Sequence, residues 1–205
     1  MTLRRIRSLP GVCGAAWPGQ LIKRARQEGN QAAKSLTTQF VVGAVGESDR
    51  ELLETVQRAH RELGLWRAYF SAFPIERSPF ADQPAEDPTR ALRLYQSDFM
   101  IRDYGFRYDE LPFDEQGLLP RDRTPKQACA ERHLHEPVEV NWASRQQLLR
   151  VPGIGPKSAD RIIAARREAR LGDITQLKAL GVTAGWAAPY VLLDGRRAAV
   201  QLRMW

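Results

Sequence analysis

The residues best suited to chemistry lie between Val151 and Ala159, in the sequence VPGIGPKSA. Two glycines flank Ile154, and glycine leaves its backbone amide uncovered by a side chain and adopts backbone angles that are closed to other residues. Pro156 suits the first turn of a helix, and the free amides at a helix N-terminus attract anions. Lys157 follows directly and adds a positive charge. Together these residues predict a site that binds phosphate groups.

A helix should lead into this segment and hold it in place. Ser144 can accept a hydrogen bond from the backbone, and Gln147, three residues later, can complete a capping box. The helix should therefore begin near Arg145. It should end near Arg150, because the residue before a proline, here Pro152, is disfavoured in helical conformation.

A second helix should follow the glycines. Ala159, Ile162 and Ile163 recur at helical spacing and form an apolar stripe that faces inward. Lys157 and Arg161 then fall nearer the outside. The apolar residue between the two glycines would pack into the angle between the helices, so the predicted element is a helix, a tight hairpin and a helix.

The run Leu148–Ile162 resembles the helix-hairpin-helix module of DNA-repair and recombination proteins. The resemblance implies sequence-independent binding of the DNA backbone, with hairpin amides on phosphate oxygens and no reading of bases. Carried over residue by residue, the resemblance implies that Gly153 and Gly155 form the turn and supply its amides. It also implies that Lys157 supplies a positive charge to a phosphate and that the Ser158 hydroxyl contacts one. The implied DNA-binding residues are Arg150, Pro152, Gly153, Ile154, Gly155, Lys157, Ser158 and Arg161. A hairpin that only packs helices, or that contacts another protein, stays open.

The distribution of charge favours the DNA-binding alternative. The chain has 31 basic and 24 acidic residues, for a net charge of +7. Residues 141–205 contain 11 basic and 4 acidic residues, whereas residues 1–140 contain 20 of each. A neutral body with a basic module at one end is typical of nucleic-acid-binding proteins. Such binding should weaken by roughly one log unit per log unit of salt for each phosphate neutralised.

The middle of the chain carries a second resemblance, to the C-terminal half of a radical SAM protein family. That family is associated with uracil-DNA glycosylase and with DNA modification or repair, and its members end in a helix-hairpin-helix. The resemblance spans residues 20–195 and implies half of an α/β barrel. The family's cofactors are S-adenosylmethionine and a [4Fe-4S] cluster. The segments that carry the resemblance are Thr37–Ala44, Glu47–Asp49, Tyr69–Pro74, Leu94–Asp98, Arg102–Phe106 and Pro137–Asn141.

The cysteines depart from the pattern of that family. Radical SAM enzymes hold the cluster with Cys-x3-Cys-x2-Cys, whereas this chain has only Cys13 and Cys129. We therefore expect no cofactor in this chain and no catalysis by the chain in isolation. Residues 1–20 do not fit the family either, which is typical of a truncated or split gene. The alternative is an enzyme acting on nucleic acid, whose cluster half comes from a separate chain. Uracil-DNA glycosylase is a further possible partner.

The expected fold is α/β, with a partial radical-SAM-like barrel followed by a small all-α helix-hairpin-helix domain. A poorly defined segment occupies residues 1–30, the partial barrel residues 31–136 and the helix-hairpin-helix domain residues 137–205. The elements expected in the partial barrel are strands 38–44 and 66–73 on either side of helix 49–63, and helices 89–104 and 126–134. A proline-rich connection should span residues 74–90. In the C-terminal domain a short helix should end at Gly181 as a degenerate second hairpin, and a terminal β-hairpin should turn at Asp194–Gly195.

The sequence gives little support for a zinc site, a phosphate loop, a catalytic site or a membrane location. Cys129, His133 and His135 could in principle bind zinc, but a fourth ligand is not evident and a solvated loop is favoured. The glycines of Gly43–Gly46 lack the Lys-Ser/Thr ending of a phosphate loop. No general acid or base and no nucleophile motif can be assigned. No apolar run reaches about 18 residues, and the N-terminus does not suit a signal peptide, so a cytoplasmic protein without a membrane span is expected.

Overall fold

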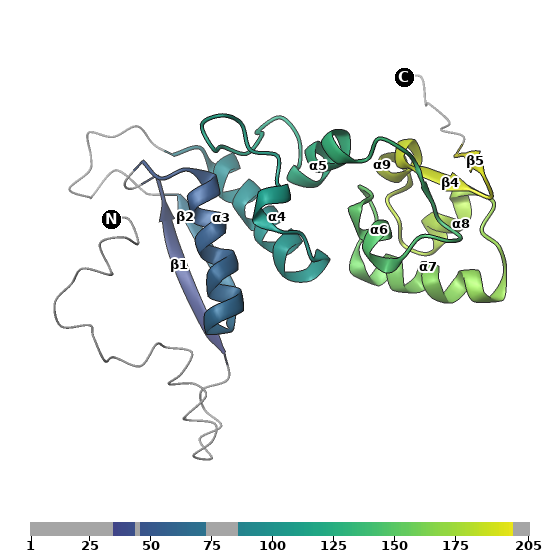
Figure 1. Cartoon of the computed structure of the whole chain (residues 1–205), viewed down its shortest axis with the longest axis horizontal. Coiled ribbons are helices and arrows are strands. Elements are labelled where there is room, and N and C mark those ends of the chain that lie inside the picture. The colour runs from purple at the N-terminus through teal and green to yellow at the C-terminus, as the bar shows by residue number, and fades with distance from the viewer. Residues whose placement is uncertain (1–34, 44–45, 73–85, 199–205) are drawn as a thin grey trace, which may run out of the picture. The chain divides into compact units, whose positions relative to one another are not determined.

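A computed structural model describes residues 35–43, 46–72 and 86–198. These residues form two compact units (Figure 1). The first consists of the described residues up to Asp98 together with Arg107–Asp109 and Phe113–Arg121, and the second of Phe99–Phe106, Glu110–Pro112 and the residues from Asp122 onward. The predicted segment 1–30, residues 44–45 of the turn between Gly43 and Gly46, and most of the proline-rich connection lie outside the described residues.

The first unit is built on a strand–helix–strand motif. Strand β1 (Leu36–Val42) and strand β2 (Leu65–Ala72) are parallel, and between them the chain forms α3 (Asp49–Arg58) and η1 (Ala59–Leu63). Helix α3 begins with the predicted capping box, and a left-handed glycine follows η1. Parallel strands need such a crossover connection. The predicted unit is therefore confirmed.

Aromatic side chains hold helix α4 (Pro88–Tyr104) against the two strands of the first unit. The rings of Phe40 and Phe70 stack at 5.7 Å, and Tyr95 meets Phe70 edge-on at 5.2 Å. The Tyr95 hydroxyl also accepts a hydrogen bond from the Phe70 amide at 3.0 Å. The ring of Tyr95 thus belongs to the core of this unit, where its polar end has a partner.

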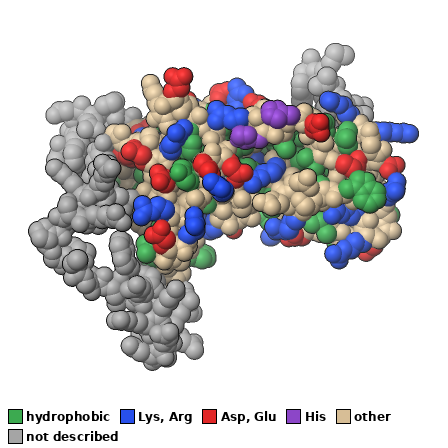
Figure 2. Space-filling view, viewed as in Figure 1, with side chains coloured by type: hydrophobic (Ala, Val, Ile, Leu, Met, Phe, Trp, Pro, Cys, Tyr) green, Lys and Arg blue, Asp and Glu red, His purple; other side chains and the backbone are tan. Residues whose placement is uncertain are grey.

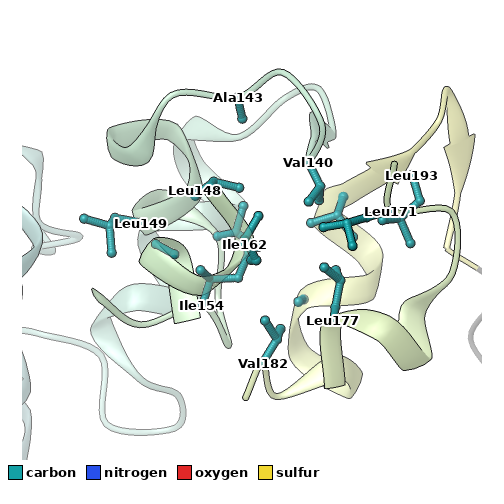
Figure 3. Close-up of a cluster of buried hydrophobic side chains, with 14 residues drawn as sticks. Val140, Ala143, Leu148, Leu149, Ile154, Ile162, Leu171, Leu177, Val182 and Leu193 are labelled. Carbon is teal, nitrogen blue, oxygen red and sulfur yellow. The ribbon is translucent and has the colours of Figure 1, made fainter. Parts of the chain in front are cut away.

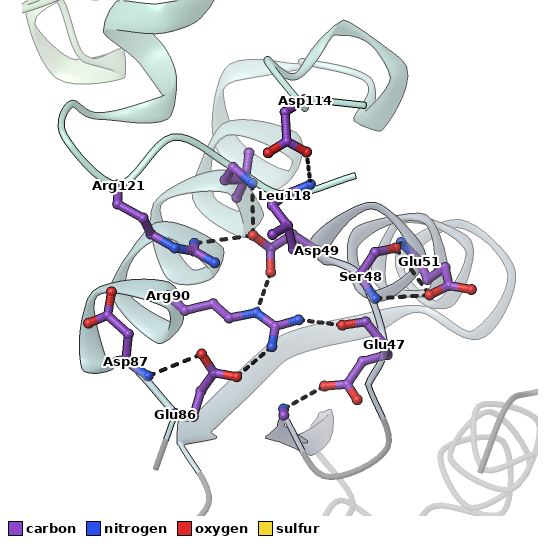
Figure 4. Close-up of polar contacts among 12 residues, drawn as sticks. Glu47, Ser48, Asp49, Glu51, Glu86, Asp87, Arg90, Asp114, Leu118 and Arg121 are labelled. Atoms are coloured by element: carbon purple, nitrogen blue, oxygen red, sulfur yellow. Dashed lines mark hydrogen bonds and ion pairs between the residues drawn. The ribbon is translucent and has the colours of Figure 1, made fainter. Parts of the chain in front are cut away.

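A buried ion-pair network ties the start of α3 to the loops around it (Figure 4). Asp49 is fully buried and accepts from Arg90 Nε at 2.7 Å, from Arg121 Nη1 at 3.2 Å and from the Leu119 amide at 2.8 Å. Arg90 also donates to Glu86 Oε2 at 2.6 Å. A buried charge is tolerated when its hydrogen-bonding positions are filled in this way.

The second unit begins with the last turns of α4 and with α5 (Pro125–His133), upstream of the hairpin. It continues through β3 (Val138–Glu139), α6 (Arg145–Arg150), α7 (Pro156–Glu168), α8 (Ile174–Ala179) and α9 (Ala184–Ala187). The chain then passes through η4 (Ala188–Tyr190), β4 (Val191–Leu193) and β5 (Arg196–Arg197). The helices predicted at 89–104 and 126–134 are confirmed to within one residue at their ends.

The expectation of an all-α C-terminal domain is wrong, because this unit contains a three-stranded sheet of order β3-β4-β5. Strand β3 is parallel to β4, and β4 is antiparallel to β5. The terminal β-hairpin is confirmed: Asp194 and Gly195 both have positive φ, 52° and 76°, as a type I′ turn requires. Strands β3 and β4, of two and three residues, are too short to show an alternating pattern, which is why their pairing escaped prediction.

One apolar cluster forms the core of the second unit (Figure 3). It draws Leu148 from α6, Ile162 from α7 and Leu177 from α8, each fully buried. The buried side chain of Asn141 binds the backbone of Leu171, a member of this cluster. It donates to the Leu171 carbonyl and accepts from the Leu171 amide, both at 2.9 Å. The short helices are thereby packed around one centre.

The described residues contain no closed barrel. Their strands form two separate sheets, one of two strands and one of three, in a mixed α/β architecture. No helix among them is long and apolar enough to cross a membrane.

Candidate nucleic-acid interface

Helix α6 begins and ends at the predicted residues, and α7 begins at the predicted residue. Ser144 caps α6: its hydroxyl accepts from the Gln147 amide at 3.2 Å, and its own amide donates to the Gln147 side chain at 2.8 Å. Helix α6 ends at Arg150, before the residue that precedes Pro152. Helix α7 begins at Pro156, with Gly155 as a cap that has no side chain to cover the helix amides.

The hairpin between them is tight and anchored by its apolar residue. Ile154 is 1% exposed, and its amide donates back to the Val151 carbonyl at 3.2 Å. Gly153 has φ of 81°, and a Cβ at this position would lie 2.5 Å from the Thr183 carbonyl oxygen. Glycine is therefore required here both by the backbone angle and by the close approach of a second chain segment.

The amides of Gly153, Gly155, Lys157 and Ser158, which we name the amide cluster, share one property. None of them donates a hydrogen bond to another residue of the described part of the chain. They lie at the hairpin and in the first turn of a 13-residue helix, where the helix dipole is positive. Unbonded amides at a helix N-terminus are available to an anion.

Two basic side chains flank the amide cluster. Lys157 and Arg161 lie four residues apart on α7, both are exposed, and neither forms an ion pair with a described residue. Some other basic side chains of the unit are paired, as in Arg145 with Asp160 and Arg170 with Asp194. On the face in Figure 2, Lys and Arg side chains are spread among acidic and neutral ones, with no single basic patch. Lys157 and Arg161 are the basic residues nearest in sequence to the amide cluster, since both lie in the first two turns of α7.

A second hairpin, Leu180–Thr183 between α8 and α9, packs against the first. The Thr183 amide donates to the Gly153 carbonyl at 3.0 Å, and the Val182 amide to the Leu177 carbonyl at 3.1 Å. Its Gly181 has φ of 86°, close to that of Gly153. The predicted degenerate second hairpin is thus present. Because its amides are used inside the protein, it supports the first hairpin and does not duplicate the amide cluster.

Two residues of the predicted site have partners elsewhere in the protein, and a third is buried. The Ser158 hydroxyl is buried and donates to the Gly181 carbonyl at 2.7 Å, so only its amide belongs to the cluster. Arg150 lies over the Phe106 ring, 3.8 Å from the centroid, and pairs with Glu110 at 3.1 Å. Pro152 is buried. These residues shape the hairpin, whereas Gly153, Gly155, Lys157 and Arg161 face outward at least in part.

The structure adds two residues that the sequence did not indicate, Lys126 on α5 and Tyr104 on α4. Lys126 Nζ donates to the Ile154 carbonyl at 2.5 Å and lies 4.4 Å from the centroid of the Tyr104 ring. Burial, and secondarily the charge of Arg150, lowers the pKa of Lys126 to about 7. Only the tertiary fold brings α5 to the hairpin, and no motif in the sequence marks this contact.

The zinc alternative receives no support from the geometry. Cys129 is buried, and its thiol donates to the Glu110 carbonyl at 3.4 Å. Burial raises the pKa of Cys129 to about 12, which disfavours the thiolate that a metal needs. His133 contacts the same carbonyl at 3.2 Å. Among the residues that the structure describes, no group of three metal-binding side chains occurs.

Comparison with known proteins identifies one similarity. Residues 134–182 match the model of the helix-hairpin-helix motif, a motif generally associated with DNA binding that is not sequence-specific. The match covers β3, α6, the hairpin, α7 and α8. No curated protein and no solved structure matches the chain.

Proposed function

We propose that this protein binds the DNA backbone without sequence preference, through the amide cluster and the side chains of Lys157 and Arg161. The observation that carries the proposal is the set of unbonded amides at the hairpin and the N-terminus of α7. Backbone amides recognise phosphate oxygens, which every DNA sequence presents alike. The match to the helix-hairpin-helix motif supports the same reading of this site.

Arg150 and Ser158, which were predicted to bind DNA directly, have a structural role in this proposal. Arg150 is engaged by Phe106 and Glu110, and the Ser158 hydroxyl by Gly181, so we expect both to hold the hairpin in shape. Substituting either should reduce DNA affinity through loss of structure. We also expect the chain to act in the cytoplasm on DNA undergoing repair or modification, as its resemblance implies.

The test is a fluorescence-anisotropy titration of the full chain against DNA duplexes of unrelated sequence, and against single strands, at several salt concentrations. Each phosphate contact that is lost should reduce the slope of log affinity against log salt by about 0.9. Lys157→Ala should show this reduction equally on every duplex. Lys178→Ala is the comparison, because Lys178 is also exposed and forms no ion pair with a described residue, but belongs to α8 and not to the first turns of α7.

Two outcomes would count against the proposal. Absent or salt-insensitive binding of the wild-type chain at low salt would refute DNA-backbone binding. Unchanged binding after Lys157→Ala and Arg161→Ala would move the function toward a protein-interaction scaffold, in which the hairpin only packs helices.

A second candidate function is a subunit of a radical SAM enzyme that acts on nucleic acid. It is favoured by the parallel β1–α3–β2 motif, since strand–helix–strand units are the repeat from which α/β barrels are built. A separate chain would supply the three cluster cysteines and the S-adenosylmethionine site, and uracil-DNA glycosylase is a further proposed partner. Co-purification with a chain carrying Cys-x3-Cys-x2-Cys, followed by cluster reconstitution, tests this. A cluster that forms equally well without the present chain would argue against it.

A further inference from the structure

Lys126 makes an unusual contact with the hairpin. It lies on α5, outside residues 134–182, and its Nζ donates to the Ile154 carbonyl at 2.5 Å. Among the described residues, no other side chain donates to a carbonyl of the hairpin Val151–Gly155. The Tyr104 ring lies on the same ammonium at 4.4 Å, and the Tyr104 hydroxyl lies 3.4 Å from where a Cβ on Gly155 would be. Residues of α4 and α5 thus contact the hairpin itself.

The contact reaches the amide cluster through a single peptide group. The carbonyl of Ile154 and the amide of Gly155 belong to the same planar peptide unit, in which C=O and N–H point in opposite directions. A donor that fixes the carbonyl on the protein side therefore aims the Gly155 amide away from Lys126. A positive charge at the carbonyl also polarises the group, so that its N–H becomes a stronger donor.

We propose that Lys126 is a positioning residue for phosphate binding, which orients the Ile154–Gly155 peptide toward DNA and, when protonated, strengthens the hold of the amide cluster on a phosphate. The inference rests on the proposed function. It identifies a residue outside the helix-hairpin-helix segment that sets DNA affinity, and it makes that affinity dependent on pH.

The charged and titratable groups around Lys126 define the expected pH window. Tyr104 faces it from α4 and Arg150 from α6, and Arg150 is paired with Glu110, whose carbonyl contacts His133 and Cys129. The pKa of Lys126 is lowered to about 7 in the free protein. A bound phosphate favours the ammonium form, so DNA binding should raise this pKa and take up a proton. Affinity should be highest below pH 7 and should fall as the pH rises above it.

The stability of the free chain should move in the opposite direction. Because the pKa of Lys126 is lower in the folded than in the unfolded state, the folded state loses its proton first. Stability should therefore rise with pH between about 7 and the unfolded value near 10.5. A lysine with a purely structural role would produce this stability change and leave DNA affinity independent of pH. The two readouts separate the alternatives.

The experiment measures the dissociation constant of the full chain for one 20-base-pair duplex between pH 6 and 9 at fixed ionic strength. For two unit charges roughly 7 Å apart, the wild-type affinity should fall by about threefold to about fiftyfold across this range, for effective dielectric constants of about 80 and about 20 respectively. Lys126→Met should bind weakly at every pH with that dependence removed. Lys126→Arg keeps its charge throughout and should bind with pH-independent affinity. Lys178→Met, the matched control, should retain the wild-type dependence.

A second measurement needs no variant. Calorimetric titration of the wild-type chain with the duplex, in two buffers of different ionisation enthalpy, should show proton uptake near pH 7. His133→Asn should leave that uptake in place, since it removes the nearby imidazole and not the lysine. Failure of the wild-type chain to bind DNA would overturn the proposed function itself. Binding without proton uptake, or an equal pH dependence in Lys126→Met, would overturn the role of Lys126 alone.

Discussion

Substituting Gly153 by alanine tests how the two hairpins depend on each other. The residue has φ of 81°, which costs an alanine about 1 kcal/mol relative to glycine. The added Cβ would also lie 2.5 Å from the Thr183 carbonyl oxygen and 3.3 Å from the Ala187 nitrogen, both of them backbone atoms. Moving them apart breaks the bond from the Thr183 amide to the Gly153 carbonyl, worth about another 1 kcal/mol.

We therefore expect Gly153→Ala to destabilise the second unit by at least about 2 kcal/mol, as the backbone strain and the lost hydrogen bond together indicate. Because the chain has two units, hydrogen exchange of the α7 amides is the suitable assay, since it reports opening of the second unit alone. Gly172→Ala is the matched control, because Gly172 does not have positive φ and a Cβ there meets nothing within 4 Å. Gly155→Ala should also keep the fold, since its φ is −99° and its Cβ would make only an ordinary contact. Wild-type protection of α7 in Gly153→Ala would refute the reasoning.

Three further predictions concern buried polar groups. Asp49→Ala should destabilise the first unit by about 3–5 kcal/mol, because the buried Arg90 Nε and the Leu119 amide lose their acceptor and Arg90 keeps Glu86 as its carboxylate partner. Urea unfolding followed at α3 measures this, and Asp87→Ala, at an exposed position, is the comparison. Asn141→Ala should cost about 2–3 kcal/mol through the unpaired Leu171 amide and carbonyl, and an unchanged melting temperature would contradict it. In a Cys13→Ser chain, Cys129 should resist alkylation at pH 8–9, because burial raises its pKa to about 12 and keeps the thiol neutral. The neutral Cys129 thiol contributes fully to stability below the unfolded pKa near 8.5, and this contribution should be lost as the pH rises toward 12. Rapid alkylation of Cys129 is expected only when the protein unfolds.

The sequence by itself determined the local elements of the candidate site. Ser144 with Gln147, Pro152 and Pro156 set the ends of α6 and α7, because capping boxes and proline act within a few residues. The same holds for the turn at Asp194–Gly195 and for the β1–α3–β2 motif. The glycine spacing was also sufficient to predict the tight hairpin, in which Gly153 has positive φ. That the hairpin binds phosphate stays a prediction. The relation to radical SAM proteins, by contrast, stays a prediction.

Only the tertiary structure decided which side chains of the site are free. Arg150 and Ser158 occur within the motif like Lys157, yet Phe106, Glu110 and Gly181 engage them from elsewhere in the chain. Lys126 reaches the hairpin from 28 residues upstream, and Thr183 contacts it from downstream. The three-stranded sheet likewise depends on pairing β3 with β4, more than 50 residues apart. Contacts over such separations leave no periodic signal in the sequence, because they depend on how whole elements pack and not on the residues that flank each position.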